Sequence, residues 1–318
     1  MGESYWWRLP GRSYDEPMAM LPAPLEERVQ QVRRALADAL RDRVIGPDAE
    51  DKRALFMDAG GERWFDESRP IRIVHSDSSM FIGGMRALLL QSLHPLAMAG
   101  VADHSDYRND PWGRLQRTAD FLVATTFGPA DLAERTIERI KTVHLTVTGT
   151  TADGTPYSAS DPHLLRWVHV AEVDSFLRAF QTYGGGRLTP QQADGYVADM
   201  AVIARALGVV APPVSVRGLR DQLLLFRHET RSTPQSRDAA RYLLLEPPLD
   251  AAARVPYMLI AGAAIATLPA WARAELRIPF VPFVDEIVTK PIGSLVARTI
   301  RWATSIDAPF PATGAATS

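Results

Sequence analysis

Helical periodicity dominates this sequence. From residue 80 to residue 305, nearly every segment repeats apolar side chains at a spacing of about 3.6 residues, as on one face of a helix. Alternating, strand-like stretches are few and short, and the main candidate is RIVH at 72–75. The sequence therefore predicts an all-α fold, built as a single multi-helix domain.

Capping residues and prolines predict where the helices begin and end. Asp110 and Asp161 each precede a proline, so each offers an N-cap acceptor before a residue that suits the first helical turn. A Gly-Pro pair at 128–129 ends one helix and starts the next. We expect helices near 25–46, 77–103 (with a kink before Pro95), 111–127, 129–147, 162–183, 190–207, 216–229, 234–245, 250–267 and 286–304.

Composition divides the chain into three parts. Residues 1–24 contain four prolines and no helical period, which predicts an extended N-terminal segment. Residues 25–305 form the expected helical domain, because no linker long enough to separate two domains interrupts them. Residues 306–318 end in APFPATGAATS, which predicts a flexible tail.

Charge and cysteine content exclude several classes of protein. The 35 basic and 37 acidic residues give a net charge of -2 without a run of like charge, so we expect neither nucleic acid nor an anionic membrane as a partner. The absence of cysteine excludes disulfides, thiolate metal sites and cysteine nucleophiles. It also suits a reducing compartment, and the N-terminus does not read as a signal peptide, so we expect a cytoplasmic location. The longest apolar run, 257–268, is too short for a transmembrane segment.

His144 is the first candidate among the seven histidines for binding a cofactor. It lies four residues after Ile140, on the apolar stripe of the segment 129–147. Two interpretations remain open: a core histidine bonded to a backbone carbonyl, or a neutral imidazole that binds haem iron. His169 is the second candidate, because the segment around it is apolar on most sides.

The other histidines have simpler interpretations. We expect His94, beside Pro95, to cap carbonyls that the kink sets free, and His104 to lie at a helix end. No histidine pair has the H-x-x-x-H spacing of a zinc site on one helix, so a metal site of protein side chains alone is not favoured. A weaker alternative is a metal held by His104 with Asp103 or Asp106.

Arg114, Arg117 and Thr118 leave one face of the helix 111–127, at positions i, i+3 and i+4. They are either solvated or bridged to a carboxylate such as Asp110 or Asp120, or they form a polar cluster over a cofactor. In the second case, the guanidinium groups would stabilise negative charge and the hydroxyl would relay a proton, as on the distal side of a haem. Packed helices lie about 8–10 Å apart, so this helix and the next would have to splay to admit a porphyrin.

Four segments together resemble one enzyme family. They are GGMRALLLQSLHPLAMAGVADHSDYRNDPWGRLQRT (83–118), ERIKTVHLTVTG (138–149), YSASDPHLLRWVH (157–169) and LPAWAR (268–273). In this order, the segments resemble those of the b-type haem oxygenases, a family that includes latex-clearing proteins (rubber oxygenases) and the MpaB-type oxygenase. The resemblance covers about residues 75–275. No nucleotide-binding loop or serine-hydrolase elbow is present to favour another class.

The resemblance implies a helical enzyme that holds haem b non-covalently between its helices. It implies that His144 is the proximal iron ligand, while Arg114, Arg117 and Thr118 match the R-x-x-K-T element of latex-clearing proteins. Arginine at 117 replaces the lysine of that element, so a lysine ligand to iron is not carried over. The chain also lacks a glutamate between Glu67 and Glu134, where latex-clearing proteins have a glutamate base, which argues against cleavage of polyisoprene.

The leading hypothesis is a cytoplasmic haem b oxygenase that uses dioxygen to oxidise, hydroxylate or cleave a C=C bond of an apolar small molecule. Arg114 and Arg117 would polarise dioxygen and Thr118 would relay a proton, with an electron donor left unassigned. The alternative is a non-catalytic helical protein that binds haem or a lipid.

Overall fold

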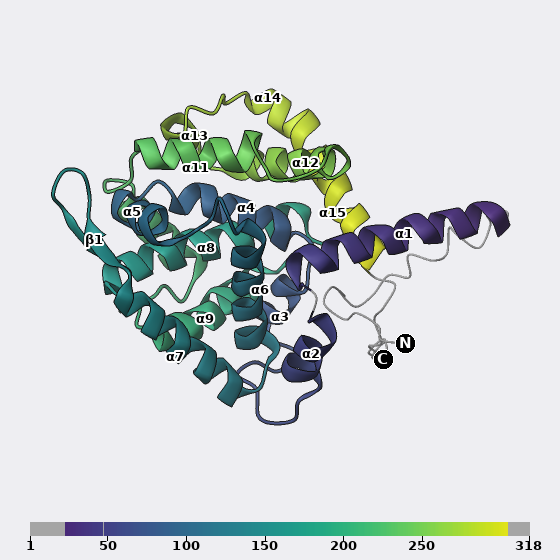
Figure 1. Cartoon of the computed structure of the whole chain (residues 1–318), viewed down its shortest axis with the longest axis horizontal. Coiled ribbons are helices and arrows are strands. Elements are labelled where there is room, and N and C mark those ends of the chain that lie inside the picture. Colours follow the sequence, from purple (N-terminus) through teal and green to yellow (C-terminus); the bar gives the residue numbers. More distant parts are fainter. Residues whose placement is uncertain (1–22, 47, 305–318) are drawn as a thin grey trace.

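The computed structural model describes residues 23–46 and 48–304, and these residues form a helical body with one small β-hairpin (Figure 1). The first half contains α1 (Ala23–Val44), α2 (Ala49–Arg53), the π-helical turn η2 (Ala54–Asp58), α3 (Pro70–His75), α4 (Met80–Gln91), α5 (Pro95–His104), α6 (Pro111–Phe127) and α7 (Ala130–Thr146). The second half contains β1 (Thr148–Thr150), β2 (Pro156–Ser158), α8 (Pro162–Tyr183), α9 (Pro190–Ala206), α10 (Val216–Phe226), α11 (Pro234–Leu245), α12 (Ala251–Thr267), α13 (Ala270–Glu275), α14 (Pro282–Val284), the π-helical turn η3 (Asp285–Thr289) and α15 (Lys290–Thr304).

The centre of the body is the pair α4 and α8, which pack closely along each other. Gly83 permits this approach, because a Cβ at that position would lie 2.7 Å from Cδ1 of Phe176 on α8. Helix α12 packs against α4 and is itself covered by α15 (Figure 1). Helix α10 packs against α8, and α3 packs against α9. Fully buried side chains such as Ile82, Leu89 and Trp167 fill the space between these helices.

Buried ion pairs connect segments that are distant in the sequence. Nη2 of Arg86 on α4 lies 2.6 Å from Oδ2 of Asp174 on α8, and Nη1 of Arg86 donates to Ser175 Oγ at 2.6 Å. Nε of Arg301 on α15 donates to Oδ2 of Asp77 at 2.9 Å, just before α4. Each charge has its counter-charge and hydrogen bonds, which is the condition under which a buried ion pair is tolerated.

The all-α prediction and the single domain are confirmed, but two local predictions are wrong. RIVH at 72–75 belongs to helix α3, which starts at Pro70 and buries Ile71 and Val74 on one side. The expected helix 77–103 is two helices, α4 and α5, because the backbone at His94 is extended (φ -86°, ψ 116°). The expected N-caps are confirmed: the Asp110 side chain accepts from Gly113 N, and that of Asp161 accepts from His163 N.

Helix α1 is attached to the body at its C-terminal part, although it extends away from it in Figure 1. It packs against α6 and α15, and Nε of Arg33 donates to the carbonyl oxygen of Trp302 at 2.9 Å. The predicted extended segment 1–24 lies almost entirely outside the described residues, and the predicted tail 306–318 lies wholly outside them.

Candidate functional site

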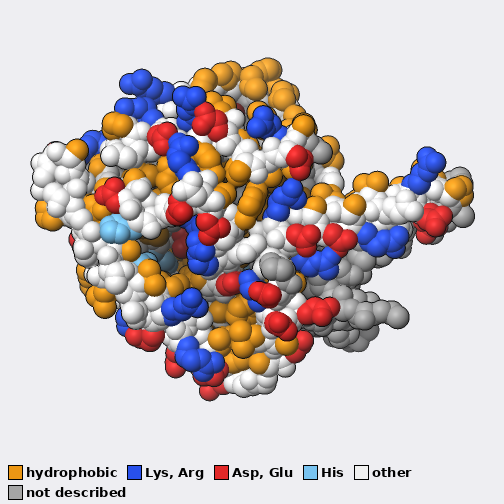
Figure 2. Space-filling view, in the orientation of Figure 1, with side chains coloured by type: hydrophobic (Ala, Val, Ile, Leu, Met, Phe, Trp, Pro, Cys, Tyr) orange, Lys and Arg blue, Asp and Glu red, His pale blue; other side chains and the backbone are white. Residues whose placement is uncertain are grey.

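The hairpin of α6 and α7 is closed at its turn and opens away from it. The buried residues of the hairpin are near the Gly-Pro turn: Ala124–Phe127 on α6, with Ala133 and Ile137 on α7. Further from the turn, both helices are half-buried or exposed, and α7 runs obliquely away from α6 (Figure 1). Figure 2 shows a hollow on this face beside α7, with histidine side chains at its edge. Burial in the hairpin is therefore greatest beside the turn and decreases toward the other ends of both helices.

His144 lies in the last turn of α7, at the open end of this hairpin. Its side chain is half-buried, and its Nδ1 is buried without a hydrogen-bond partner among the described residues. Burial lowers the pKa of the His144 imidazole below its ordinary value, which favours the neutral ring. A neutral imidazole has the free lone pair that a metal ligand requires.

His169 lies on α8 and is almost completely buried. Its Nε2 lacks a hydrogen-bond partner in the part of the chain that the structure describes. Burial lowers the pKa of His169 to about 4, with a smaller contribution from the cationic Arg205. His169 is therefore a second neutral imidazole with a nitrogen available to a ligand.

The structure separates the three residues of the predicted polar cluster. Arg114 is half-buried and donates from Nη1 to Ser105 Oγ at 2.8 Å, and burial lowers its pKa. The side chain of Arg117 is 66% exposed and forms an ion pair with Asp110 Oδ2 at 3.0 Å. Thr118 is exposed, and its hydroxyl donates to the carbonyl oxygen of Arg114 at 3.0 Å. Of the three, Arg114 is the side chain withdrawn from water.

A buried polar group that the sequence did not indicate lies where α3, α6, α8 and α9 meet. His75 Nδ1 is 2.8 Å from Thr126 Oγ1, and its Nε2 is 3.3 Å from the hydroxyl of Tyr196. Burial lowers the pKa of His75 to about 3, and it raises the pKa of the nearby Glu172 carboxyl to about 7. Glu172 follows His169 by three residues on α8, so both leave the same side of that helix. This spacing was the available signal in the sequence.

The remaining predicted metal ligands have other partners. His104 Nε2 is 3.0 Å from the carbonyl oxygen of Thr148, and Asp103 Oδ2 accepts from the Tyr157 hydroxyl at 2.5 Å. Within the described residues, the three-residue groups with metal-binding geometry do not include His104, Asp103 or Asp106. His104 does lie at a helix end, as expected.

The decisive comparison is with protein families. The model for "ER-bound oxygenase mpaB/B'/Rubber oxygenase, catalytic domain" matches residues 71–302, which extends from α3 into α15. The chain belongs to this oxygenase family. The match is longer at both ends than the range of about 75–275 over which the sequence motifs resemble the family. No curated protein and no solved structure matches the chain.

Membership in the mpaB/rubber oxygenase family assigns the helical body to an oxygenase catalytic domain, so the protein is an enzyme that uses dioxygen and a substrate. The hairpin of α6 and α7, α8 and the buried residues around His75 all lie inside the matched range. Helix α1 lies outside it. None of the helices in residues 23–46 and 48–304 combines the length and apolar character needed to cross a membrane.

Proposed function

We propose that this member of the mpaB/rubber oxygenase family is a haem b-dependent oxygenase that acts on an apolar small molecule. One observation carries the proposal: His144 and His169 are withdrawn from water, are neutral near pH 7, and each has a buried nitrogen unpartnered among the described residues. Burying an imidazole without a partner costs free energy, and binding a metal ion through the buried nitrogen would recover that cost. The chain has no cysteine, so a bound haem would be non-covalent.

In this proposal His144 holds the iron, and His169 lines the cofactor pocket. Bound haem would supply the redox-active iron at which dioxygen is activated. The protein contributes burial around His144 and His169, which lowers the pKa of both rings and so favours their neutral forms. The proposed substrate is apolar because the matched family description includes rubber oxygenases, and rubber is an apolar polymer.

Arg114 has the clearest electrostatic role. Its guanidinium group remains charged and is half-buried, so it would stabilise negative charge more strongly than the same group in water. We also propose that Arg117 polarises dioxygen and that Thr118 relays a proton. Each of these roles requires the side chain to leave its present partner, which is Asp110 for Arg117 and the Arg114 carbonyl for Thr118.

Glu172 is the proposed proton carrier of the site. A carboxyl group with a pKa of about 7 exchanges a proton readily near neutral pH. Latex-clearing proteins are expected to have a glutamate base on a different segment, and this chain lacks it there. Glu172 on α8 would supply a carboxyl group from another helix.

The first test is haem binding by purified variants. Hemin added to the wild-type chain should give a Soret band, and His144→Ala should remove it or shift it. His104→Ala is the matched control, because His104 is exposed and bonded to a backbone carbonyl. A wild-type chain without a Soret band, or a band lost in His169→Ala but kept in His144→Ala, would contradict the assignment of the iron ligand.

The second test is turnover by arginine variants. Removing one preorganised group that stabilises developing charge typically lowers kcat by about 10²–10³. We expect a loss of this size for Arg114→Ala and a much smaller loss for the exposed Arg117→Ala. Oxygenated products formed from an apolar lipid extract can be counted by mass spectrometry, with the same haem content in each sample. A larger loss in Arg117→Ala than in Arg114→Ala would reverse the assignment.

The cytoplasm is the proposed compartment, because a chain without cysteine suits a reducing environment. The electron donor is proposed to be a separate component.

A further inference from the structure

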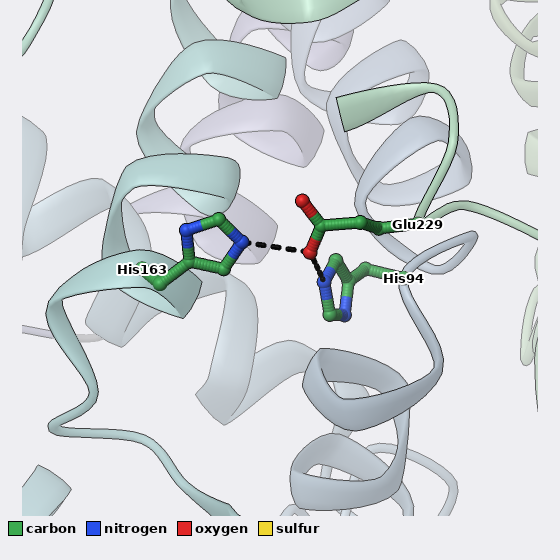
Figure 3. A group of neighbouring side chains, drawn as sticks. All are labelled: His94, His163 and Glu229. Carbon is green, nitrogen blue, oxygen red and sulfur yellow. Dashed lines mark hydrogen bonds and ion pairs between the residues drawn. The ribbon is translucent and has the colours of Figure 1, made fainter. Parts of the chain in front are cut away.

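Three side chains outside the proposed haem site meet at one point, although they come from distant parts of the chain (Figure 3). His94 directly precedes α5, His163 is in the first turn of α8, and Glu229 follows the end of α10. One nitrogen of each ring and one carboxylate oxygen all lie within 4.8 Å of one another. Two of these segments are also joined directly, because Arg231 N, two residues after Glu229, donates to the carbonyl oxygen of Leu93 at 2.9 Å.

His94 is the unusual member of this group. Its side chain is only 4% exposed, and within the described residues neither ring nitrogen makes a hydrogen bond. The prediction that His94 caps freed carbonyls is therefore wrong. Its Nε2 is directed at Glu229, with 3.5 Å between Nε2 and Oε2 (Figure 3). A polar ring that is buried without hydrogen bonds and aimed at a carboxylate indicates a missing ligand.

The distances in the group are close to those of a metal site. Zinc binds imidazole nitrogen at about 2.0–2.1 Å and carboxylate oxygen at about 2.0–2.2 Å in tetrahedral geometry, which places neighbouring donor atoms about 3.3 Å apart. The separation of 3.5 Å between His94 and Glu229 matches this value. His163 Nε2 is 2.7 Å from Glu229 Oε2, so these two side chains would separate by about 0.6 Å when an ion enters.

Partly exposed side chains can make such an adjustment without disturbing the core. The side chain of His163 is 47% exposed and that of Glu229 is 43% exposed. Apolar rings surround the buried side of the group: Phe226 lies 4.9 Å from the His163 ring, and Trp167 lies 6.1 Å from the His94 ring. An apolar shell of this kind limits water on one side and leaves the other side open to solvent.

We propose that His94, His163 and Glu229 bind one divalent transition-metal ion, with Zn²⁺ as the best match. Two imidazoles and one carboxylate suit zinc, whereas Mg²⁺ and Ca²⁺ prefer oxygen ligands. The half-exposed side provides a fourth position for water. The ion would clamp the junction of α4 and α5 to the start of α8, the helix that carries His169 six residues after His163.

Zinc binding by the untagged full chain tests this proposal. The protein is treated with a chelator, dialysed and titrated with Zn²⁺ against a chromophoric competitor, and retained zinc and iron are measured separately by elemental analysis. His163→Ala and Glu229→Gln are the test variants, because both side chains are partly exposed and the fold should tolerate their loss. His228→Ala is the matched control, because His228 is exposed, adjacent to Glu229 and outside the group.

The expected result is about one zinc ion per chain for wild type and for His228→Ala. His163→Ala and Glu229→Gln should each weaken zinc binding by more than about tenfold, since loss of even an outer-shell partner costs that much. The proposal is overturned if wild type retains no zinc. It is also overturned if both test variants bind zinc as tightly as wild type.

Discussion

Acidification should destabilise this fold through His75, which is 6% exposed and enclosed by Thr126, Tyr196 and Phe176. Burial lowers the pKa of His75 from 6.5 to about 3. The unfolded chain therefore takes up a proton at this ring as the pH falls below 6.5, while the folded chain does not. The contribution of the neutral His75 ring to the free energy of unfolding is fully present above pH 6.5 and is lost progressively as the pH falls toward 3.

The size of the effect follows from the pKa difference. Between pH 7 and pH 5 the unfolded ring becomes almost fully protonated, and the folded ring remains neutral. Linkage then gives a loss of about 2 kcal/mol in the free energy of unfolding from this residue, at 1.36 kcal/mol per pKa unit. His169, with a pKa of about 4, should contribute a loss of about the same size over this range.

Urea denaturation at pH 7 and pH 5, without added haem, measures this effect. Carboxylates also titrate, so the informative quantity is the difference between wild type and His75→Gln, which keeps a polar side chain that does not ionise. The variant should lose about 2 kcal/mol less than wild type over this interval. His228→Gln is the control at an exposed position and should behave as wild type. If His75→Gln shows the wild-type pH dependence, the ring is not held neutral in the folded state.

Two further predictions concern the glycines of α4 and Glu172 on α8. Adjacent glycines on α4 should respond in opposite directions: Gly83→Ala should destabilise the fold by about 1–3 kcal/mol, because its Cβ would meet Phe176 Cδ1 at 2.7 Å, whereas Gly84→Ala, with open space around its Cβ, should stabilise it by up to about 1 kcal/mol. Thermal unfolding compares the two, and equal effects would contradict the close packing of α4 on α8. Glu172→Gln should remove an ionisation near pH 7 from the pH dependence of kcat, since burial places the pKa of this carboxyl at about 7. An unchanged pH profile in that variant would exclude Glu172 as the proton carrier.

The sequence predicted the helices well where local signals decided them. The caps at Asp110 and Asp161 are short-range features, and the structure has them where they were expected. The β-branched residues of RIVH predict a strand, whereas Pro70 and the burial of Ile71 and Val74 on one side favour helix α3. Pro95 predicts a kink at His94, but a proline in a helical pattern gives the same signal for a bent helix and for two separate helices.

Long-range assembly explains what the sequence did not reveal at the candidate sites. His94, His163 and Glu229 are 66 or more residues apart in consecutive pairs, and no spacing rule connects them. Their proximity depends on how α5, α8 and the end of α10 pack. Glu172 was similarly hidden, because its unusual pKa arises from burial between helices and not from its neighbours in the sequence.

The arginines of α6 show that helical periodicity predicts which face a side chain leaves but not how deeply it is buried. Positions 114, 117 and 118 fall within an arc of about 100° on an ideal helix of 3.6 residues per turn, so periodicity assigns all three side chains to one face. The boundary with solvent passes through that arc, because Ser105 covers Arg114 and Asp110 holds Arg117 outward. The energy of a charge interaction depends strongly on the local dielectric, so two neighbouring arginines on one helix can stabilise a negative charge to different extents. The half-buried guanidinium of Arg114 would act on charge at the site, whereas the exposed ion pair of Arg117 is screened by water.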